Sequence, residues 1–73
     1  MSRIPLKKMV RIADNISALY QLGAISSVEK NELASCLQQG QEGLEALYLK
    51  TMSMEASEHD IMCSIRETII FEN

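Results

Sequence analysis

Residues 26–52 read SSVEKNELASCLQQGQEGLEALYLKTM, and the apolar positions in this stretch recur at steps of three and four. They are Leu33, Cys36, Leu37, Gly40, Leu44, Leu47 and Tyr48. This spacing places them on one face of an α-helix. The pattern keeps its phase through Gly40 and Gly43, although a glycine inside a helix costs about 1 kcal/mol relative to alanine. The stretch therefore predicts a single helix over about residues 27–52.

Two points about this predicted helix stay open. Because the two glycines weaken it, a break within residues 39–42 is the alternative. Gly40 lies on the apolar stripe itself, where it is either a tolerated weak point or a place of close approach by a neighbouring backbone.

The residues before this stretch predict a first helix over about residues 4–22. Its apolar face consists of Leu6, Met9, Ile12, Ala13, Ile16, Leu19 and Tyr20. Pro5 suits a first helical turn, and Ser2 can cap it. Gly23 can end the helix, while Ser26 and Glu29 have the spacing of a capping box. The short connection at residues 23–26 predicts an antiparallel helical hairpin.

The residues after the stretch predict a third helical segment over about residues 56–70, with Ile61, Met62, Ile65, Ile69 and Ile70 at helical spacing. A break near residues 53–57, with Ser57 as a cap, separates it from the second helix. An unbroken helix from residue 27 to about 70 is the alternative. The expected fold is therefore all-α, a helical hairpin with a third segment, in one domain spanning residues 1–73.

Composition predicts a small cytoplasmic protein that associates with itself or with a partner. The chain has 73 residues, of which 47% are hydrophobic and 23% charged. A domain of this size is marginally stable without a metal, disulfides or oligomerisation. We expect a dimer, since the two cysteines, Cys36 and Cys63, fit reduced and packed thiols better than a disulfide framework. No stretch resembles a membrane span or a secretory signal.

The charges are divided between the two ends of the sequence. Residues 1–25 carry four cations, Arg3, Lys7, Lys8 and Arg11, and one anion, whereas residues 53–73 carry one cation and five anions. In an up-down-up arrangement the first and third helices start at the same end, so the cations would pair with Glu55, Glu58 and Asp60. The alternative is contact of these four cations with nucleic acid, which would make the protein a small DNA-associated regulator.

Apolar residues near the junction of the second and third segments exceed what one small core can bury. We expect Leu49, Met52, Met54, Ile61 and Met62 to form a partner-binding face, because flexible methionines suit surfaces that accept a partner's helix. His59 and Cys63 are one helical turn apart, but two ligands do not complete a zinc site, so we expect no metal and no cofactor. With a single histidine in the chain, catalysis is not expected.

The predicted function is thus a non-enzymatic interaction module, such as an adaptor, a small regulator or a chaperone subunit. Small bacterial accessory proteins, including plasmid copy-control hairpins and co-chaperones of secretion needle subunits, have a comparable architecture. No run of residues identifies either group, so the comparison concerns the architecture alone.

Overall fold

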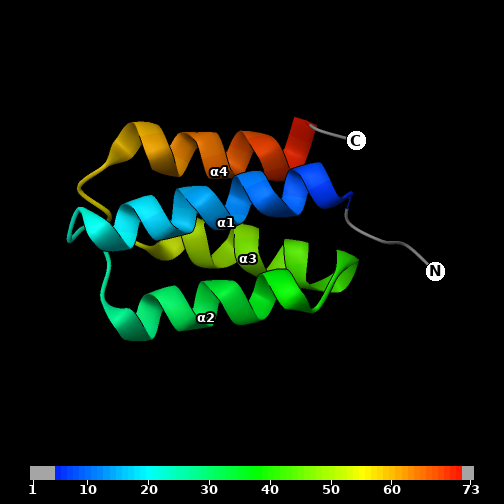
Figure 1. Ribbon diagram of the computed structural model, residues 1–73, viewed down its shortest axis with the longest axis horizontal. Helices are drawn as coiled ribbons and strands as arrows, with labels where there is room; N and C mark the ends of the chain where they lie inside the picture. The colour runs from blue at the N-terminus through cyan, green and yellow to red at the C-terminus, as the bar shows by residue number, and fades with distance from the viewer. Residues whose placement is uncertain (1–4, 72–73) are drawn as a thin grey trace.

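The computed structural model describes residues 5–71, apart from the side chains of Gln41 and Phe71. This part of the chain forms four helices, α1 (Leu6–Gln21), α2 (Ser27–Gln38), α3 (Gln41–Ser53) and α4 (His59–Phe71). Each helix packs on the next and α4 also packs on α1, which closes an antiparallel bundle measuring 35 × 21 × 20 Å (Figure 1). The all-α class is confirmed, but four helices replace the expected hairpin with a third segment.

The prediction of one helix over residues 27–52 is wrong, because the chain reverses at Gln39 and Gly40. Gly40 has a φ of 78°, a left-handed conformation that glycine adopts without steric cost. The close approach of a neighbouring backbone occurs at Gly43 instead, where an added β-carbon would lie 1.7 Å from the carbonyl oxygen of Cys36. Both glycines therefore belong to a tight helical hairpin between α2 and α3.

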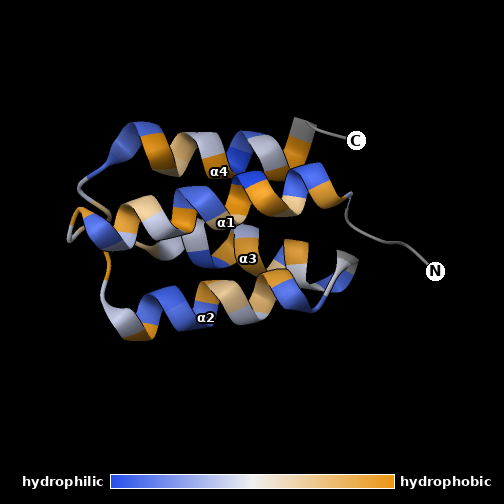
Figure 2. Ribbon diagram, in the orientation of Figure 1, coloured by the Kyte–Doolittle hydropathy of each residue, from blue (hydrophilic) through white to orange (hydrophobic). Residues whose placement is uncertain are grey.

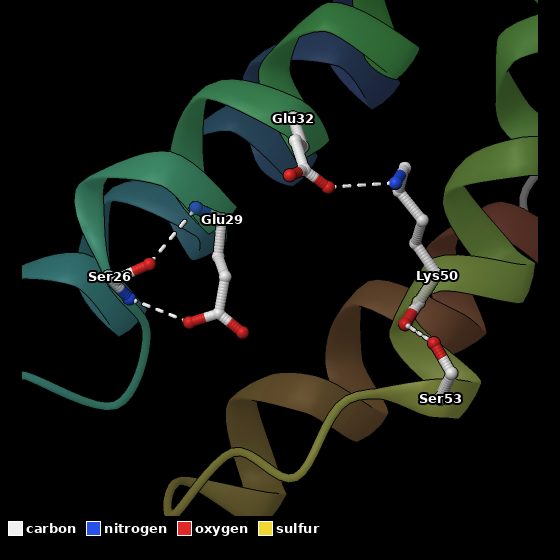
Figure 3. A network of polar contacts seen from close by, with 5 residues as sticks. All are labelled: Ser26, Glu29, Glu32, Lys50 and Ser53. Carbon is white, nitrogen blue, oxygen red and sulfur yellow. Dashed lines mark hydrogen bonds and ion pairs between the residues drawn. The ribbon is translucent and has the colours of Figure 1, made fainter.

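The turn between α1 and α2 follows its predicted chemistry. Gly23 has a φ of 77°, and its N–H donates to the carbonyl of Tyr20. Ser26 Oγ accepts from the Glu29 N–H at 3.2 Å, while the Ser26 N–H donates to Glu29 Oε1 at 2.8 Å (Figure 3). The capping box is confirmed. Pro5, however, precedes α1 as its N-cap residue, and the predicted cap Ser2 lies outside the described residues.

The predicted break between the second and third segments is confirmed, at residues 54–58. The last helix begins at His59, three residues later than expected, and its first turn is closed by the Met62 N–H donating to the carbonyl of Glu58. In addition, Arg66 of α4 donates a hydrogen bond to the carbonyl of Thr51, in the last turn of α3, where helical carbonyls lack partners within the helix. This bond ties the two helices together.

The buried hydrophobic residues form one core cluster, and all four helices carry hydrophobic segments, orange in Figure 2. The buried members of this core are Ile12, Ile16, Leu19, Ile25, Leu33, Cys36, Leu37, Leu44, Leu47, Met62 and Ile65. Two buried threonines, Thr51 and Thr68, donate their hydroxyls to carbonyls of their own helices. Asn15 of α1 donates to Ser64 Oγ of α4 at 3.0 Å. The α1–α4 contact is therefore partly polar.

The extra reversal at Gly40 also changes which helix ends are neighbours. With four helices, α4 runs antiparallel to α1, so the start of α1 lies beside the end of α4 (Figure 1). Glu58 and Asp60 lie at the start of α4, at the far end of the bundle from Lys7. The predicted pairing of the basic cluster with the acidic cluster is therefore wrong.

Candidate interaction surface

The five residues predicted to bind a partner have three different environments. Leu49 and Met52 are 62% and 55% exposed on α3. Met54 and Ile61 are half-buried and pack against the core, and Met62 is buried within it at 3% exposure. An accessible partner face can therefore include Leu49 and Met52 but not Met62, whose side chain fills space between the helices.

Leu49 and Met52 continue a line of exposed residues along the outer face of α3. Glu42, Glu45, Leu49 and Met52 follow at steps of three, four and three, and all four are exposed. We call these four residues the α3 outer stripe. It lies opposite the side of α3 that buries Leu44 and Leu47, because a helix that packs one face on a core presents the other to solvent.

Sequence reasoning missed the two glutamates of the α3 outer stripe. The signal was present, since Glu42 and Glu45 share the helical phase of Leu49 and Met52. An apolar surplus identified from composition does not indicate which helix face carries it, so it does not point to these glutamates. The stripe therefore has an acidic half near the start of α3 and an apolar half near its end.

The cation nearest in sequence to the apolar half is already engaged. Lys50 Nζ donates to Glu32 Oε2 of α2 at 2.8 Å (Figure 3). The hydrogen bond and the charge of Glu32 raise the pKa of Lys50 above its ordinary value. Lys50 is thus held toward α2 and does not neutralise the glutamates of the α3 outer stripe.

A small groove lies beside this ion pair. Its lining residues are Glu29, Glu32, Leu33, Lys50, Ser53 and Met54, and its volume is about 100 Å³. Small-molecule sites commonly measure roughly 300 to 1,000 Å³ and are largely apolar. The groove is therefore too small and too polar to suggest a cofactor or substrate site.

The four predicted nucleic-acid contacts do not form one accessible patch among the described residues. Lys7 and Arg11 are exposed one turn apart on α1, and Arg11 already makes a polar or electrostatic contact within the protein. Lys8 is only 5% exposed, since it lies on the face of α1 that also buries Ile12. Arg3 lies outside the described residues. The prediction that Lys8 contacts a ligand at the surface is therefore not supported by its position.

The outer side of α1 carries exposed apolar side chains beside its charges. Leu6 is 76% exposed and Val10 is 50% exposed. Together with Lys7, Arg11, Asp14 and Asn15 they line a shallow depression. A leucine and a valine one turn apart on an outer helix face leave apolar area without a partner within the described bundle.

His59 and Cys63 lie close together at the start of α4, with His59 Nε2 3.3 Å from Cys63 Sγ. The i and i+4 spacing brings them onto the same helix face. Within residues 5–71 no group of three potential metal ligands converges. The pair therefore lacks the further ligands of a structural zinc site.

No family model matches this chain, and no match was found among curated proteins or solved structures. None of the four helices described is both long and apolar enough to cross a membrane. The functional argument therefore depends on the exposed faces of α1 and α3.

Proposed function

We propose that this protein is a non-enzymatic protein–protein interaction module, of the adaptor, regulator or chaperone-subunit kind, which binds a helical partner through the α3 outer stripe. The observation that carries the proposal is the exposure of Leu49 and Met52, at 62% and 55%, side by side on one helix. Large apolar side chains that adjoin each other on a surface are typical of interaction sites.

The chemistry of the α3 outer stripe indicates the kind of partner. Leu49 and Met52 offer an apolar anchor point, and the flexible thioether of Met52 can adapt to the shape of the partner's side chains. Glu45 and Glu42, one and two turns from Leu49, favour cations beside the partner's apolar residues. The proposed partner is therefore an amphipathic helix with lysine or arginine flanking its apolar face.

Self-association and a cytoplasmic location belong to the same proposal. A bundle this small, with no disulfide between Cys36 and Cys63, gains stability by burying further apolar area in a dimer. Both thiols are free, as a reducing compartment would maintain them; Cys36 is buried in the core and Cys63 is half-buried.

Site-specific photo-crosslinking tests the partner face. A photoreactive side chain is placed at Leu49 or at Met52, with an identical one at the exposed Glu67 of α4 as the matched control. We expect one defined adduct with a second protein from the first two positions and none from the control. Equal labelling at all three positions, or no adduct at Leu49 and Met52, would count against the proposal.

The DNA-associated regulator remains the alternative function. A DNA complex should weaken steeply between about 50 and 200 mM salt, whereas an apolar interface should respond little. Retention on immobilised duplex DNA, compared between the wild type and Lys7→Glu at both salt concentrations, separates the two functions.

A further inference from the structure

The outer face of α1 bears a second stripe, distinct from the one on α3. Leu6, Val10, Ala13 and Ser17 follow at steps of four, three and four, and all are exposed. We call them the α1 outer stripe. Steps of this kind form the seam by which two helices pack as a coiled coil. The stripe is apolar at three of its four positions.

One cation, Lys7, and one anion, Asp14, lie beside the α1 outer stripe. Lys7 directly follows Leu6 and Asp14 directly follows Ala13, so the two charges lie seven residues apart on the same flank of the stripe. Neither makes an ion pair within residues 5–71. A cation and an anion two turns apart on one flank are matched by the same flank of an identical helix that runs in the opposite direction.

We propose that the α1 outer stripe docks onto the α1 outer stripe of a second copy of this chain, with the two helices antiparallel about a twofold axis. Val10 then lies opposite Ala13 of the second copy, and Lys7 lies opposite Asp14 of the second copy. The symmetry repeats both contacts. This inference rests on the self-association included in the proposed function and assigns that self-association a surface and an orientation.

The α3 outer stripe does not offer the same self-complementarity. Its charges are Glu42 and Glu45, and Lys50 is held by Glu32, so two copies would bring like charges together. In addition, α1 and α3 are not neighbours in the bundle and lie diagonally across it. A dimer through α1 therefore leaves the α3 outer stripe accessible to a different partner.

Charge exchange tests the inference, with sedimentation equilibrium of the full chain as the measurement. Lys7→Glu alone places two carboxylates opposite each other at each of two symmetric positions, and Asp14→Lys alone places two amines opposite each other. We expect each single variant to raise the dimer dissociation constant by about tenfold or more, since exposed charge pairs have modest energies that act twice here. The double variant Lys7→Glu/Asp14→Lys keeps the net charge and should restore the wild-type constant.

Mixing the two single variants gives the sharpest result. A chain with Lys7→Glu and a chain with Asp14→Lys complement each other at both positions, so the mixture should dimerise as the wild type does, although each variant alone does not. Glu67→Lys, which changes the net charge as Asp14→Lys does but lies on α4, is the control and should leave the constant unchanged. Circular dichroism of every variant verifies that the bundle is folded.

Three results would overturn the inference. If the wild type is a monomer up to about 1 mM, no second copy occupies the α1 outer stripe. If it dimerises but the single variants and the mixture behave like the wild type, another surface makes the dimer. The wild type can also stay monomeric but bind a different helical protein. If Val10→Glu abolishes that binding, the different protein occupies the α1 outer stripe. The crosslinking at Leu49 and Met52 is independent of all three results.

Discussion

A β-carbon added at Gly43 of α3 would lie 1.7 Å from the backbone carbonyl oxygen of Cys36 in α2. A contact this short requires the backbones to move apart, because a carbonyl cannot rotate away as a side chain can. We expect Gly43→Ala to lower the free energy of unfolding by about 1–3 kcal/mol or more. Urea unfolding followed by circular dichroism measures this cost.

Gly40 provides the matched control for Gly43, because a β-carbon there would meet no atom within 4 Å. Its φ of 78° still penalises most side chains, so Gly40→Ala should cost about 1–2 kcal/mol. Gly40→Asn should cost about as much as Gly40→Ala, because the ψ of −143° at Gly40 lies outside the left-handed α region that asparagine tolerates. If Gly43→Ala cost no stability, the close approach of Gly43 to Cys36 would be contradicted.

The capping box of α2 predicts a local loss of stability. Ser26→Ala removes the hydroxyl that accepts from the Glu29 N–H and should cost about 0.5–2 kcal/mol. Ser35→Ala, at an exposed position inside the same helix, is the control and should be neutral or slightly stabilising, because alanine is the better helix former. Thermal unfolding of both variants compares the two effects, and equal melting temperatures would contradict the role of the cap.

Two leucines of α3 allow a core position to be compared with a surface position. Leu44 is 4% exposed and Leu49 is 62% exposed, so the same truncation has different consequences. We expect Leu44→Ala to cost about 2–5 kcal/mol, which is enough to unfold a marginal domain. Leu49→Ala should change stability by less than about 0.5 kcal/mol and reduce partner binding instead. A fold that collapses with Leu49→Ala would remove Leu49 from the proposed partner face.

The ion pair between Lys50 and Glu32 predicts a dependence on alkaline pH. Because the pKa of Lys50 is raised in the folded state, the pair stabilises the fold below the ordinary lysine pKa of about 10.4 and loses its effect as the pH rises through the raised value. The difference in unfolding free energy between the wild type and Lys50→Gln should therefore be present at pH 7 and vanish at strongly alkaline pH. Added salt should reduce the same difference at pH 7, since both side chains are exposed. A difference that is independent of pH would assign the effect to packing of the lysine stem.

The helical stripes predicted most of the core correctly. Leu33, Cys36, Leu37, Leu44 and Leu47 are buried as their three-and-four spacing indicates. The same regularity concealed the reversal at Gly40, because two antiparallel helices that face one core can carry stripes in the same phase as one longer helix. Periodicity reports which side chains face inward, but it does not report the direction in which the chain runs.

The candidate surface was predictable only in part, for a related reason. Leu49 and Met62 are both large apolar residues near the same junction, yet one is 62% and the other 3% exposed. Lys8, which composition placed at the surface, is buried on the face of α1 that also carries Ile12. Whether a side chain is buried depends on which helix faces pack together. The pairs of faces that pack together depend in turn on the number of helices and on the direction in which each one runs.

The sequence by itself determined the features whose causes lie within a few residues: the all-α class, the turn at Gly23, the capping box of Ser26 and Glu29, and most of the inward positions of the helices. Each of these depends on local backbone geometry or on the 3.6-residue period. Three residues that the apolar stripe of the first helix also places inward, Leu6, Ala13 and Tyr20, are exposed. Tertiary structure alone decided the features that depend on chain direction. The left-handed turn at Gly40 reverses the chain once more, sets α4 antiparallel to α1, and places the start of α1 far from Asp60. It also leaves the outer faces of α1 and α3 on separate sides of the bundle, because helices that lie diagonally across a four-helix bundle expose opposite surfaces.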